Sequence, residues 1–356
     1  MKRNKIVLTG GGTTGHVAVN LALIPILQKD NWEIHYIGSK KGIEKDLIKD
    51  IEGVKYHEIS TGKLRRQFSF RNFTDVFRVL WGCIQSIFKI AKIRPNVAFS
   101  KGGFVSVPVL FGAWVNRVPS ISHESDLTPG LANKLVQPFV STIFTTFPET
   151  EKYIKSGKGK LLGPVIRQDL KNGTKDEGKK FVGIVDEKPI ILVMGGSLGA
   201  KKLNDLIREN LDILLKDYNI IHSTGKDGYD NTIKREGYYQ FEYLKEELKD
   251  ILATSDIVIS RAGANSIFEF LYYKIPMLLI PLPAGNSRGD QVDNAKSFEN
   301  NGYAIVLEEK SINNEKFLEK INTLSSRKKE FKENMNKFQF ADTVLEIYNS
   351  INKIKK

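Results

Sequence analysis

Short apolar runs rich in Val, Ile and Phe alternate along this chain with longer amphipathic stretches. This alternation predicts repeated β-α-β units, in which the strands pair in parallel and helices cover the sheet. We predict strands at residues 5–9, 33–37, 96–99, 118–122, 141–145, 189–194, 218–222, 256–259 and 277–280. The expected fold class is therefore α/β, with doubly wound parallel sheets.

The length of 356 residues favours two domains, because single hydrophobic cores usually divide below this size. The boundary is expected within residues 155–188, where Gly, Pro and charged residues make poor core material. We place the first domain at residues 1–163 and the second at residues 164–339.

The longest amphipathic stretch, residues 68–94, is predicted to be a helix with an ordinary core-facing stripe. Its members are Phe73, Val76, Phe77, Leu80, Ile84, Ile87, Phe88 and Ala91. Adding Val79, Trp81, Cys83 and Ile90 widens the apolar arc to roughly 200°, more than one buried face requires. Either the helix packs on two sides, or residues 68–94, extended by Trp114, dock on an anionic membrane surface.

The formal charge of +13 indicates an anionic partner. Basic residues are concentrated between Lys63 and Lys101, but no recognised nucleic-acid motif accompanies them, so nucleic acid is not an expected partner. No run reaches the roughly 18 apolar residues of a spanning helix, and no secretory signal is visible. A single cysteine, Cys83, excludes an intramolecular disulfide and a thiolate metal cluster. We expect a cytoplasmic protein.

Two glycine-rich turns follow predicted strands, one in each half: residues 10–16 and residues 195–199. Bare backbone amides at the start of a helix can approach an anionic ligand. A dinucleotide fold would also need a carboxylate about 20 positions on, at the end of the second strand. That strand ends in Gly38-Ser39-Lys40, so a nicotinamide cofactor is disfavoured and no cofactor is expected.

Polar residues cluster after several predicted strands of the first half. His16 closes the first glycine turn, and an imidazole with an ordinary pKa of about 6.5 can accept a proton near neutrality. We expect a catalytic or phosphate-contacting role, with a turn-stabilising role as the alternative. The segments 100–104 and 123–126 follow further strands, so these loops should converge on one rim.

In the second half, the segment Ser260–Glu269 follows a predicted strand. Small residues at the helix start would let diphosphate oxygens approach the amides. Glu269 can accept hydrogen bonds from two vicinal hydroxyls, as on a ribose; a solvated helix residue is the plainer alternative.

Taken together, six segments resemble the MurG family of peptidoglycan glycosyltransferases: residues 10–16, 100–104, 123–126, 195–199, 260–269 and 290–295. These enzymes transfer N-acetylglucosamine from its UDP donor to lipid-linked muramoyl pentapeptide, converting lipid I to lipid II. The resemblance implies a GT-B architecture with two facing Rossmann-like domains and a cleft between them. It also implies an acceptor-binding, membrane-associating first domain, a donor-binding second domain, and a final segment, 340–356, that crosses back to the first. Such an enzyme would work peripherally on the cytoplasmic face of the cell membrane.

The resemblance also implies residue roles. Contacts to UDP-N-acetylglucosamine would come from Thr13, Thr14, Gly15, Arg167, Gly196, Ser197, Asn204, Leu244, Ala264, Asn265, Ser266, Glu269, Asp290 and Gln291. The acceptor diphosphate would lie against Gly12, Thr13, His16, Gly102, Gly103 and Phe104. The catalytic candidates are His16, Asp126 and Glu124, with His16 preferred as the general base and Asp126 as the runner-up. Asp126 stands where the family usually has asparagine, and Asp290-Gln291 where it has two glutamines.

The expected reaction is a single inverting displacement. Because the sequence holds no Asp-x-Asp motif, no metal is expected, and helix amides near Gly263 and Ser197 together with Arg167 would stabilise the departing diphosphate. Three alternatives stay open. They are a UDP-N-acetylglucosamine epimerase of the same architecture, a glycosyltransferase acting on diacylglycerol, and a non-catalytic nucleotide-sugar-binding module.

Overall fold

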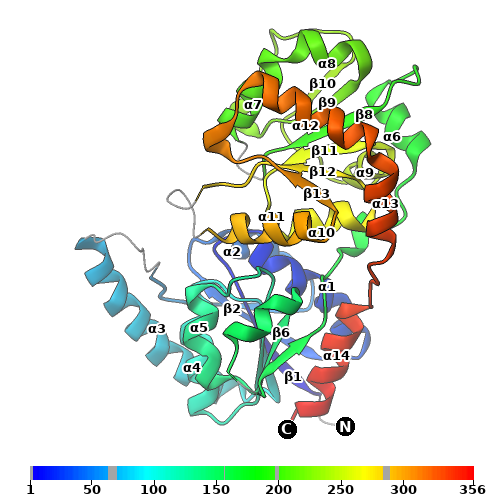
Figure 1. The fold of residues 1–356 in the computed structure, drawn as a ribbon. Coiled ribbons are helices and arrows are strands. Elements are labelled where there is room, and N and C mark those ends of the chain that lie inside the picture. Colours follow the sequence, from blue (N-terminus) through cyan, green and yellow to red (C-terminus); the bar gives the residue numbers. More distant parts are fainter. Residues whose placement is uncertain (1–2, 63–69, 156, 197–199, 284–288) are drawn as a thin grey trace. The chain divides into compact units, whose positions relative to one another are not determined.

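A computed structural model describes residues 3–62, 70–155, 157–196, 200–283 and 289–356, with side chains described from residue 75 onward in the second range. The chain divides into two compact units (Figure 1). Unit 1 contains Met1–Arg167 and Ala341–Lys356, and unit 2 contains Gln168–Phe340. The boundaries expected from the sequence, 163/164 and 339/340, lie within a few residues of these.

Unit 1 is built on a parallel sheet of seven strands in the order β3-β2-β1-β4-β5-β6-β7. The strands are β1 (Lys5–Thr9), β2 (Glu33–Ser39), β3 (Val54–Ile59), β4 (Val97–Ser100), β5 (Ser120–Glu124), β6 (Thr142–Thr145) and β7 (Gly159–Leu161). The helices are α1 (Gly15–Lys29), α2 (Ile43–Ile48), α3 (Phe70–Ile93), α4 (Ser106–Val115), α5 (Leu131–Val136) and α14 (Thr343–Ile354).

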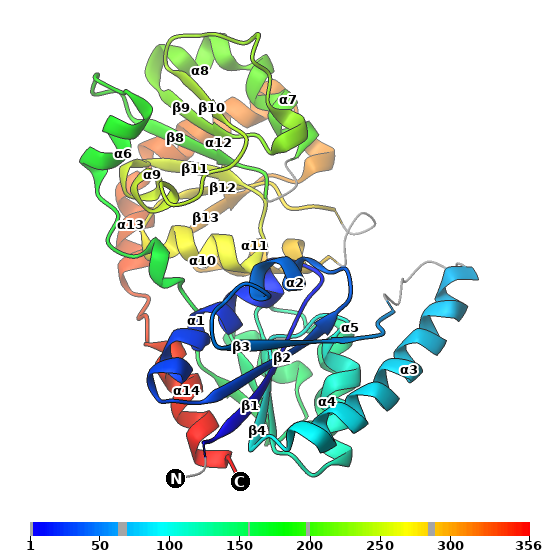
Figure 2. The ribbon, with the colours of Figure 1, turned by 180° about the vertical axis from the view of Figure 1, so that it is seen from behind.

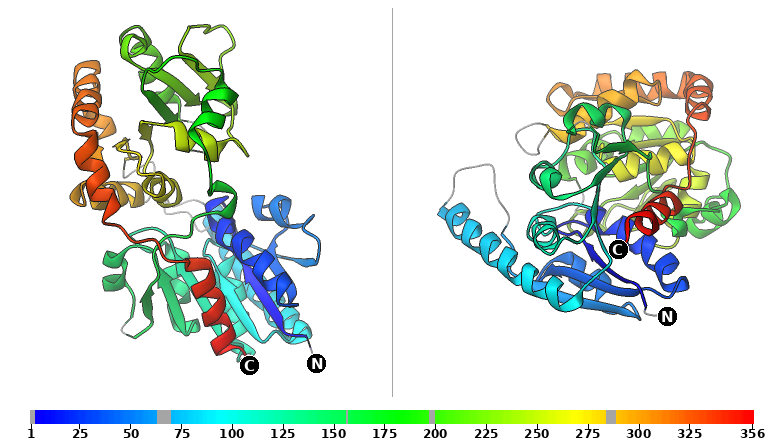
Figure 3. Two further views of the ribbon diagram at one scale, coloured as in Figure 1. Left: turned by 90° about the vertical axis from the view of Figure 1, so that its right-hand side faces the viewer. Right: turned by 90° about the horizontal axis from the view of Figure 1, so that it is seen from below.

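Both faces of this sheet are covered. Ile6 and Leu8 of β1 pack into a core with α1, α2 and α14, whereas Val7 packs into a second core with α3 and α4. This alternation follows from the period-two geometry of a strand. Figure 3 shows α14 alongside α1, and Val344, Ile347 and Ile351 of α14 are buried in the first core. The C-terminal helix is therefore part of the core of unit 1.

Unit 2 has a parallel sheet of six strands in the order β10-β9-β8-β11-β12-β13. The strands are β8 (Ile190–Met194), β9 (Asn219–Ser223), β10 (Tyr238–Phe241), β11 (Ile257–Ser260), β12 (Met277–Leu279) and β13 (Ala304–Val306). The helices are α6 (Lys175–Val182), α7 (Lys201–Glu209), α8 (Leu211–Asp217), α9 (Leu248–Thr254), α10 (Ala264–Tyr272), α11 (Asp290–Asn300), α12 (Asn314–Ser326) and α13 (Lys328–Asn336).

The strands that the hydrophobic pattern did not predict are β3, β7, β10 and β13, which are the edge strands of the two sheets. An edge strand is less enclosed than a central one and need not be continuously apolar. All of β7 is exposed, and β3 alternates apolar residues with Lys55, His57 and Glu58. Edge position thus explains why β3 and β7 were missed, whereas β13 is apolar throughout and was missed for another reason.

The prediction of a core-facing stripe on α3 is wrong. Most of its described members, among them Leu80, Ile84 and Phe88, are exposed. The buried side instead carries Gly82, Ser86 and Ile90. A Cβ on Gly82 would overlap the carbonyl oxygen of Ser60, and one on Gly112 of α4 would lie 2.9 Å from Ser86 Cβ. Small residues, rather than large apolar ones, let α3 pack closely on α4. Figure 2 shows α3 running past α4 along one side of unit 1.

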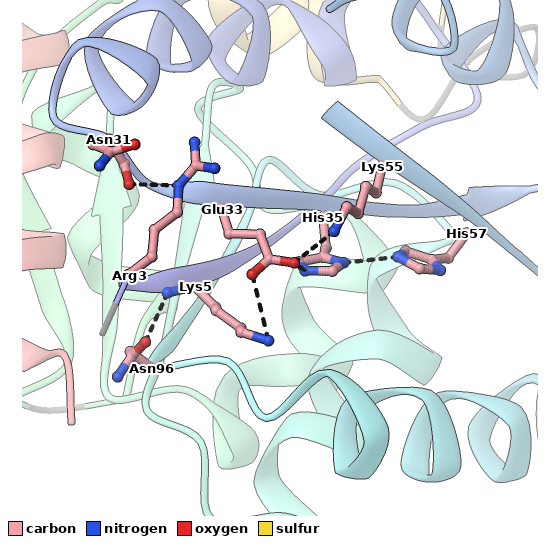
Figure 4. A network of polar contacts seen from close by, with 8 residues as sticks. All are labelled: Arg3, Lys5, Asn31, Glu33, His35, Lys55, His57 and Asn96. Carbon is pink, nitrogen blue, oxygen red and sulfur yellow. Dashed lines mark hydrogen bonds and ion pairs between the residues drawn. The ribbon is translucent and has the colours of Figure 1, made fainter. Parts of the chain in front are cut away.

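A polar network crosses β2 and β3, with Glu33, His35 and Lys55 in the amino-terminal halves of their strands and His57 just past the middle of β3 (Figure 4). Glu33 pairs with Lys55 at 2.7 Å and Lys5 at 3.4 Å, and the hydrogen bond from Lys55 is the main reason that the pKa of Glu33 is lowered to about 2. His35 bridges Glu33 and His57 at 3.1 and 2.8 Å. Burial lowers the pKa of His57 to about 4. Because the glycine turns lie at the other ends of the strands, we interpret this network as structural.

Candidate functional site

Three loops follow the adjacent strands β1, β4 and β5 of unit 1 at their carboxyl ends. The first two touch: Gly12 and Gly103 have φ of +93° and +84°, a Cβ on Gly103 would overlap the carbonyl oxygen of Gly11, and one on Gly12 would lie 2.6 Å from the ring of Phe104. The positive φ and the close approach explain why glycine occupies both positions. The structure therefore brings Gly12, Gly103 and Phe104 together, as the sequence predicted.

The expectation that no carboxylate lies at the end of β2 is wrong, because Glu44 of α2 supplies one. Its Oε1 accepts hydrogen bonds from Ser39 N–H at 3.1 Å and Ser39 Oγ at 2.5 Å, and its Oε2 accepts one from Gly12 N–H at 3.1 Å. Glu44 is completely buried. A carboxylate committed to these donors is unsuited to ribose hydroxyls, so a dinucleotide site remains disfavoured for this different reason.

Glu124 fixes the loop that follows β5. Its Oε1 accepts a hydrogen bond from Asp126 N–H at 3.0 Å, and its Oε2 accepts bonds from Gly130 N–H at 2.9 Å and Asn133 Nδ2 at 2.8 Å. Glu124 is also buried. These contacts describe a carboxylate that holds the loop in place, and a catalytic role for Glu124 stays a prediction.

Lys101, the first residue after β4, is a buried cation beside this loop. Its Nζ lies 3.0 Å from His123 Nδ1 and hydrogen-bonds Ser125 Oγ. Burial lowers the pKa of Lys101 to about 8, and the charges of Glu124 and Asp126 oppose that shift. Burial also lowers the pKa of His123 well below its ordinary value, so this imidazole is neutral. Sequence reasoning noted the segment around Lys101 but gave the residue no role.

His16 and Asp126 occupy the loops on either side of the β4 turn. His16 is the second residue of α1, just after the first glycine turn, and Asp126 follows β5; both are half-buried. Since β1 and β5 both neighbour β4, these two candidates lie on the same edge of the sheet as Gly102 and Gly103.

In unit 2, the turn between β11 and α10 has open space beside it. A Cβ built on Gly263 or on Gly196 would meet no described atom within 4 Å, so an anion could approach these backbones closely. Ser260 Oγ donates to Met194 O at 2.6 Å, which ties the end of β11 to the end of β8. Ser197 and its neighbours to residue 199 lie outside the described residues, as do residues 284–288.

Most of the predicted donor-site residues lie at or near the carboxyl ends of the unit 2 strands. Ala264, Asn265, Ser266 and Glu269 are all on α10, and Glu269 is only 8% exposed. Gln291 at the start of α11 accepts hydrogen bonds from Leu282 N–H at 3.1 Å and Ala262 N–H at 3.4 Å. Leu244, Asp290 and Arg167 are half-buried, and Arg167 is the last residue of the first segment of unit 1.

Asn204 points into the interior of unit 2 instead of outward. Its Nδ2 donates to Thr224 O at 2.9 Å, its Oδ1 lies 3.0 Å from His222 Nε2, and the residue is 2% exposed. Burial lowers the pKa of His222 to about 3, so the ring is neutral. These bonds support the β9 end of the sheet, and a direct contact of Asn204 with a ligand stays a prediction.

Arg261 is a buried residue that sequence reasoning missed. Its Nη1 donates to Ile280 O at 2.9 Å, and its Nη2 lies 2.7 Å from Glu309, which is itself buried. The pair joins the turn before α10 to the ends of β12 and β13. In the sequence, the one sign of this role is that an arginine follows a strand and precedes a run of small residues.

An apolar face lies on the other side of unit 1 from the α1–α14 layer. Exposed side chains gather on α3, α4 and α5, with Trp81 at 55% and Phe88 at 71% exposure. The set is Val76, Phe77, Leu80, Trp81, Ile84, Phe88, Trp114, Val115, Leu131 and Leu135, which we call the α3–α5 face. An open hollow of about 650 Å³ adjoins it, lined by Trp81, Phe88, Lys40 and Lys89 among others. Over the described ranges, no helix is both long and apolar enough to span a membrane.

Comparisons with known proteins agree with this architecture. Models of the glycosyltransferase family 28 N-terminal domain and C-terminal domain match residues 6–145 and 190–347. The UDP-N-acetylglucosamine–N-acetylmuramyl-(pentapeptide) pyrophosphoryl-undecaprenol N-acetylglucosamine transferase of Clostridium tetani is 55% identical over 352 residues, covering 99% of this chain and 98% of that protein. The enzyme of the same name from Geobacillus thermodenitrificans is 53% identical over 341 residues, covering 96% of each.

Solved structures show the same fold. The crystal structure of Acinetobacter baumannii MurG has a TM-score of 0.80 at 20% identity, covering 99% of this chain and 100% of that one. A UDP-GlcNAc 2-epimerase from Methanocaldococcus jannaschii has a TM-score of 0.66 at 14% identity, covering 99% and 100%. The predicted fold class, GT-B with two doubly wound α/β domains, is confirmed. Fold alone does not separate transferase from epimerase, whereas the sequence relatives are transferases.

Proposed function

We infer that this chain, which belongs to glycosyltransferase family 28, transfers N-acetylglucosamine from UDP-N-acetylglucosamine to the 4-hydroxyl of undecaprenyl-pyrophosphoryl-N-acetylmuramoyl pentapeptide. The observation that carries this is the identity of 49–55% to transferases with this activity in their names, over almost the whole length of both chains. The reaction makes lipid II from lipid I in peptidoglycan synthesis.

The donor is assigned to unit 2. The open turns at Gly196 and Gly263 leave room for a diphosphate beside backbone amides, and α10 directs its amino-terminal end toward that space. Glu269 on the same helix would accept hydrogen bonds from the ribose hydroxyls, and the backbone of Leu244 would contact the uracil. Gln291 and Asp290 at the start of α11 would contact the sugar.

The acceptor diphosphate is assigned to the paired turns of unit 1. Because Gly12 N–H is already donated to Glu44 and Gly102 N–H to Ser100 Oγ, the amides of Thr13 and Gly103 are the better candidates. Glu44 would then act by holding the first turn in shape. Phe104, whose ring lies against Gly12, would limit how far the acceptor enters.

The proposed chemistry is one inverting displacement. The muramoyl 4-hydroxyl attacks the anomeric carbon, the bond to UDP breaks, and the hydroxyl proton passes to His16, with Asp126 as the alternative base. Negative charge grows on the diphosphate, and helix amides near Gly263 together with Arg167 would stabilise it.

A metal-free mechanism of this kind predicts turnover that survives a chelator. Transfer should proceed at an unchanged rate in EDTA, measured against a parallel reaction with added Mg²⁺. Complete loss of activity in EDTA, restored by a divalent ion, would refute this part of the proposal.

Peripheral attachment to the cytoplasmic face of the membrane is assigned to the α3–α5 face. Its apolar side chains are flanked by Arg78, Lys92 and Lys134, all exposed. Apolar burial in the interface and attraction of Lys and Arg to anionic lipid, about 1 kcal/mol each, would act together.

The decisive experiment incubates purified protein with radiolabelled UDP-N-acetylglucosamine and one of two acceptors, the undecaprenyl-linked muramoyl pentapeptide or diacylglycerol. We expect label in the first lipid only. Label in diacylglycerol would support the glycolipid alternative, and conversion of the nucleotide sugar without any acceptor would support an epimerase. Either result would overturn the proposal.

A further inference from the structure

We propose that Lys101 is a positioning residue for the acceptor side of the reaction: its buried ammonium holds the segment 123–126, which comprises the end of β5 and the start of the next loop, and places a positive charge opposite Asp126. This inference rests on the proposed function. Lys101 is not among the residues to which that proposal gives a role.

Lys101 joins the two loops that carry His16 and Asp126. Its backbone N–H donates to Thr9 O at 3.0 Å, at the end of β1, and its Cβ lies beside Gly10. Its side chain extends the other way to the loop after β5. One residue therefore links the start of the first glycine turn to the loop of the alternative base.

The end of β5 and the loop after it are held from two sides. Alternate residues, His123 and Ser125, contact Lys101, whereas Glu124 between them contacts Gly130 and Asn133. Asp126 comes next, with its N–H donated to Glu124. If the ammonium is removed, one of the two sides is lost, and the segment that carries Asp126 is held less firmly.

Charge explains why a lysine suits this place. The titratable groups facing its Nζ, within the described residues, are His123, Glu124 and Asp126. Two carboxylates on one short segment repel each other, and a cation that attracts both offsets that repulsion. His123 is neutral, and because Lys101 donates to its Nδ1, the ring proton resides on Nε2. A buried ammonium without these partners would be costly.

The test compares Lys101→Met, which keeps the shape and removes the charge, with Lys29→Met, the same change at an exposed lysine at the end of α1. We expect Lys101→Met to lower kcat on the order of 10²-fold, as a misplaced loop does, while KM for UDP-N-acetylglucosamine stays unchanged. Lys29→Met should keep the wild-type kcat.

The pH profile supplies a readout that a purely structural role would not move. Wild-type kcat should fall as pH rises through about 8, where Lys101 loses its proton, and Lys101→Met should lack that basic limb. Should Lys101→Met not fold, Ser125→Ala serves instead. It removes one partner of the ammonium, and we expect the basic limb to move to lower pH.

The outcomes separate two failures. If the wild type transfers nothing to the lipid acceptor, the proposed function and this inference fall together. If the wild type transfers normally and Lys101→Met, or Ser125→Ala in its place, keeps the wild-type kcat and pH profile, only the role of Lys101 is overturned.

Discussion

At the scale of single residues, Glu44 is a buried carboxylate that accepts three hydrogen bonds, from Ser39 and Gly12. In Glu44→Gln, the amide nitrogen would face either Gly12 N–H or the buried Ser39 donors, and whichever it faces loses its acceptor. The free energy of unfolding should fall by about 1–3 kcal/mol, measured by urea denaturation of unit 1 fluorescence. Glu52→Gln, at an exposed position, is the control. Equal stability of the two variants would contradict the role given to Glu44.

Lys101 makes a second prediction, on stability instead of turnover. Its pKa is about 8 in the folded chain and about 10.4 when unfolded, so between these values the unfolded state binds more protons. Stability of the wild type should therefore rise with pH across this window, relative to Lys101→Met. Thermal unfolding of both proteins from pH 7 to 10.5 measures the difference. A difference that stays flat would contradict a depressed pKa.

These residues also mark where sequence reasoning ends. The glycine turns could be predicted because strand, turn and helix are contiguous. Glu44 could not, since it lies 32 residues from the Gly12 amide that it accepts. Lys101 and Arg261 each follow a predicted strand directly, but their burial and their partners depend on how distant loops meet. The partners of a buried charge come from the tertiary structure, which local pattern does not encode.

At the scale of elements, α3 shows that an apolar helix face need not belong to the protein core. Pattern alone assigned its large apolar residues to the core, whereas the structure packs the helix through Gly82 and Ser86 and leaves the large residues exposed. The spacing of apolar residues tells which side of a helix is apolar and does not tell whether protein or lipid covers it. The central strands could be predicted because they are buried on both faces, so their sequences are short, continuous apolar runs.

The α3–α5 face yields a prediction at this scale. Phe88→Glu combined with Trp81→Glu should abolish cosedimentation with vesicles containing anionic lipid, because two charges would enter the apolar interface. Transfer to a water-soluble, short-chain acceptor should stay within a few-fold of the wild type. Phe181→Glu, at an exposed position of unit 2, is the control. Unchanged vesicle binding by the double variant would rule out this face.

At the scale of the whole molecule, unit 2 is one continuous segment and unit 1 is assembled from two. A chain ending at Phe340 lacks α14, whose Val344, Ile347 and Ile351 would each forfeit about 1.5–3 kcal/mol of burial. We expect unit 1 to unfold while unit 2 still binds UDP, measured by calorimetry and limited proteolysis. Loss of UDP binding, or a fully protease-resistant unit 1, would contradict this division.

Because unit 1 is discontinuous in sequence, the two units can complete their cores only in a fixed order during synthesis. Helix α14 is synthesised after every residue of unit 2, so the first strands to be made wait for one of the last helices before their core closes. Until then the nascent chain carries an open apolar sheet face together with the exposed α3. Newly made molecules thus complete the core of unit 2 before that of unit 1.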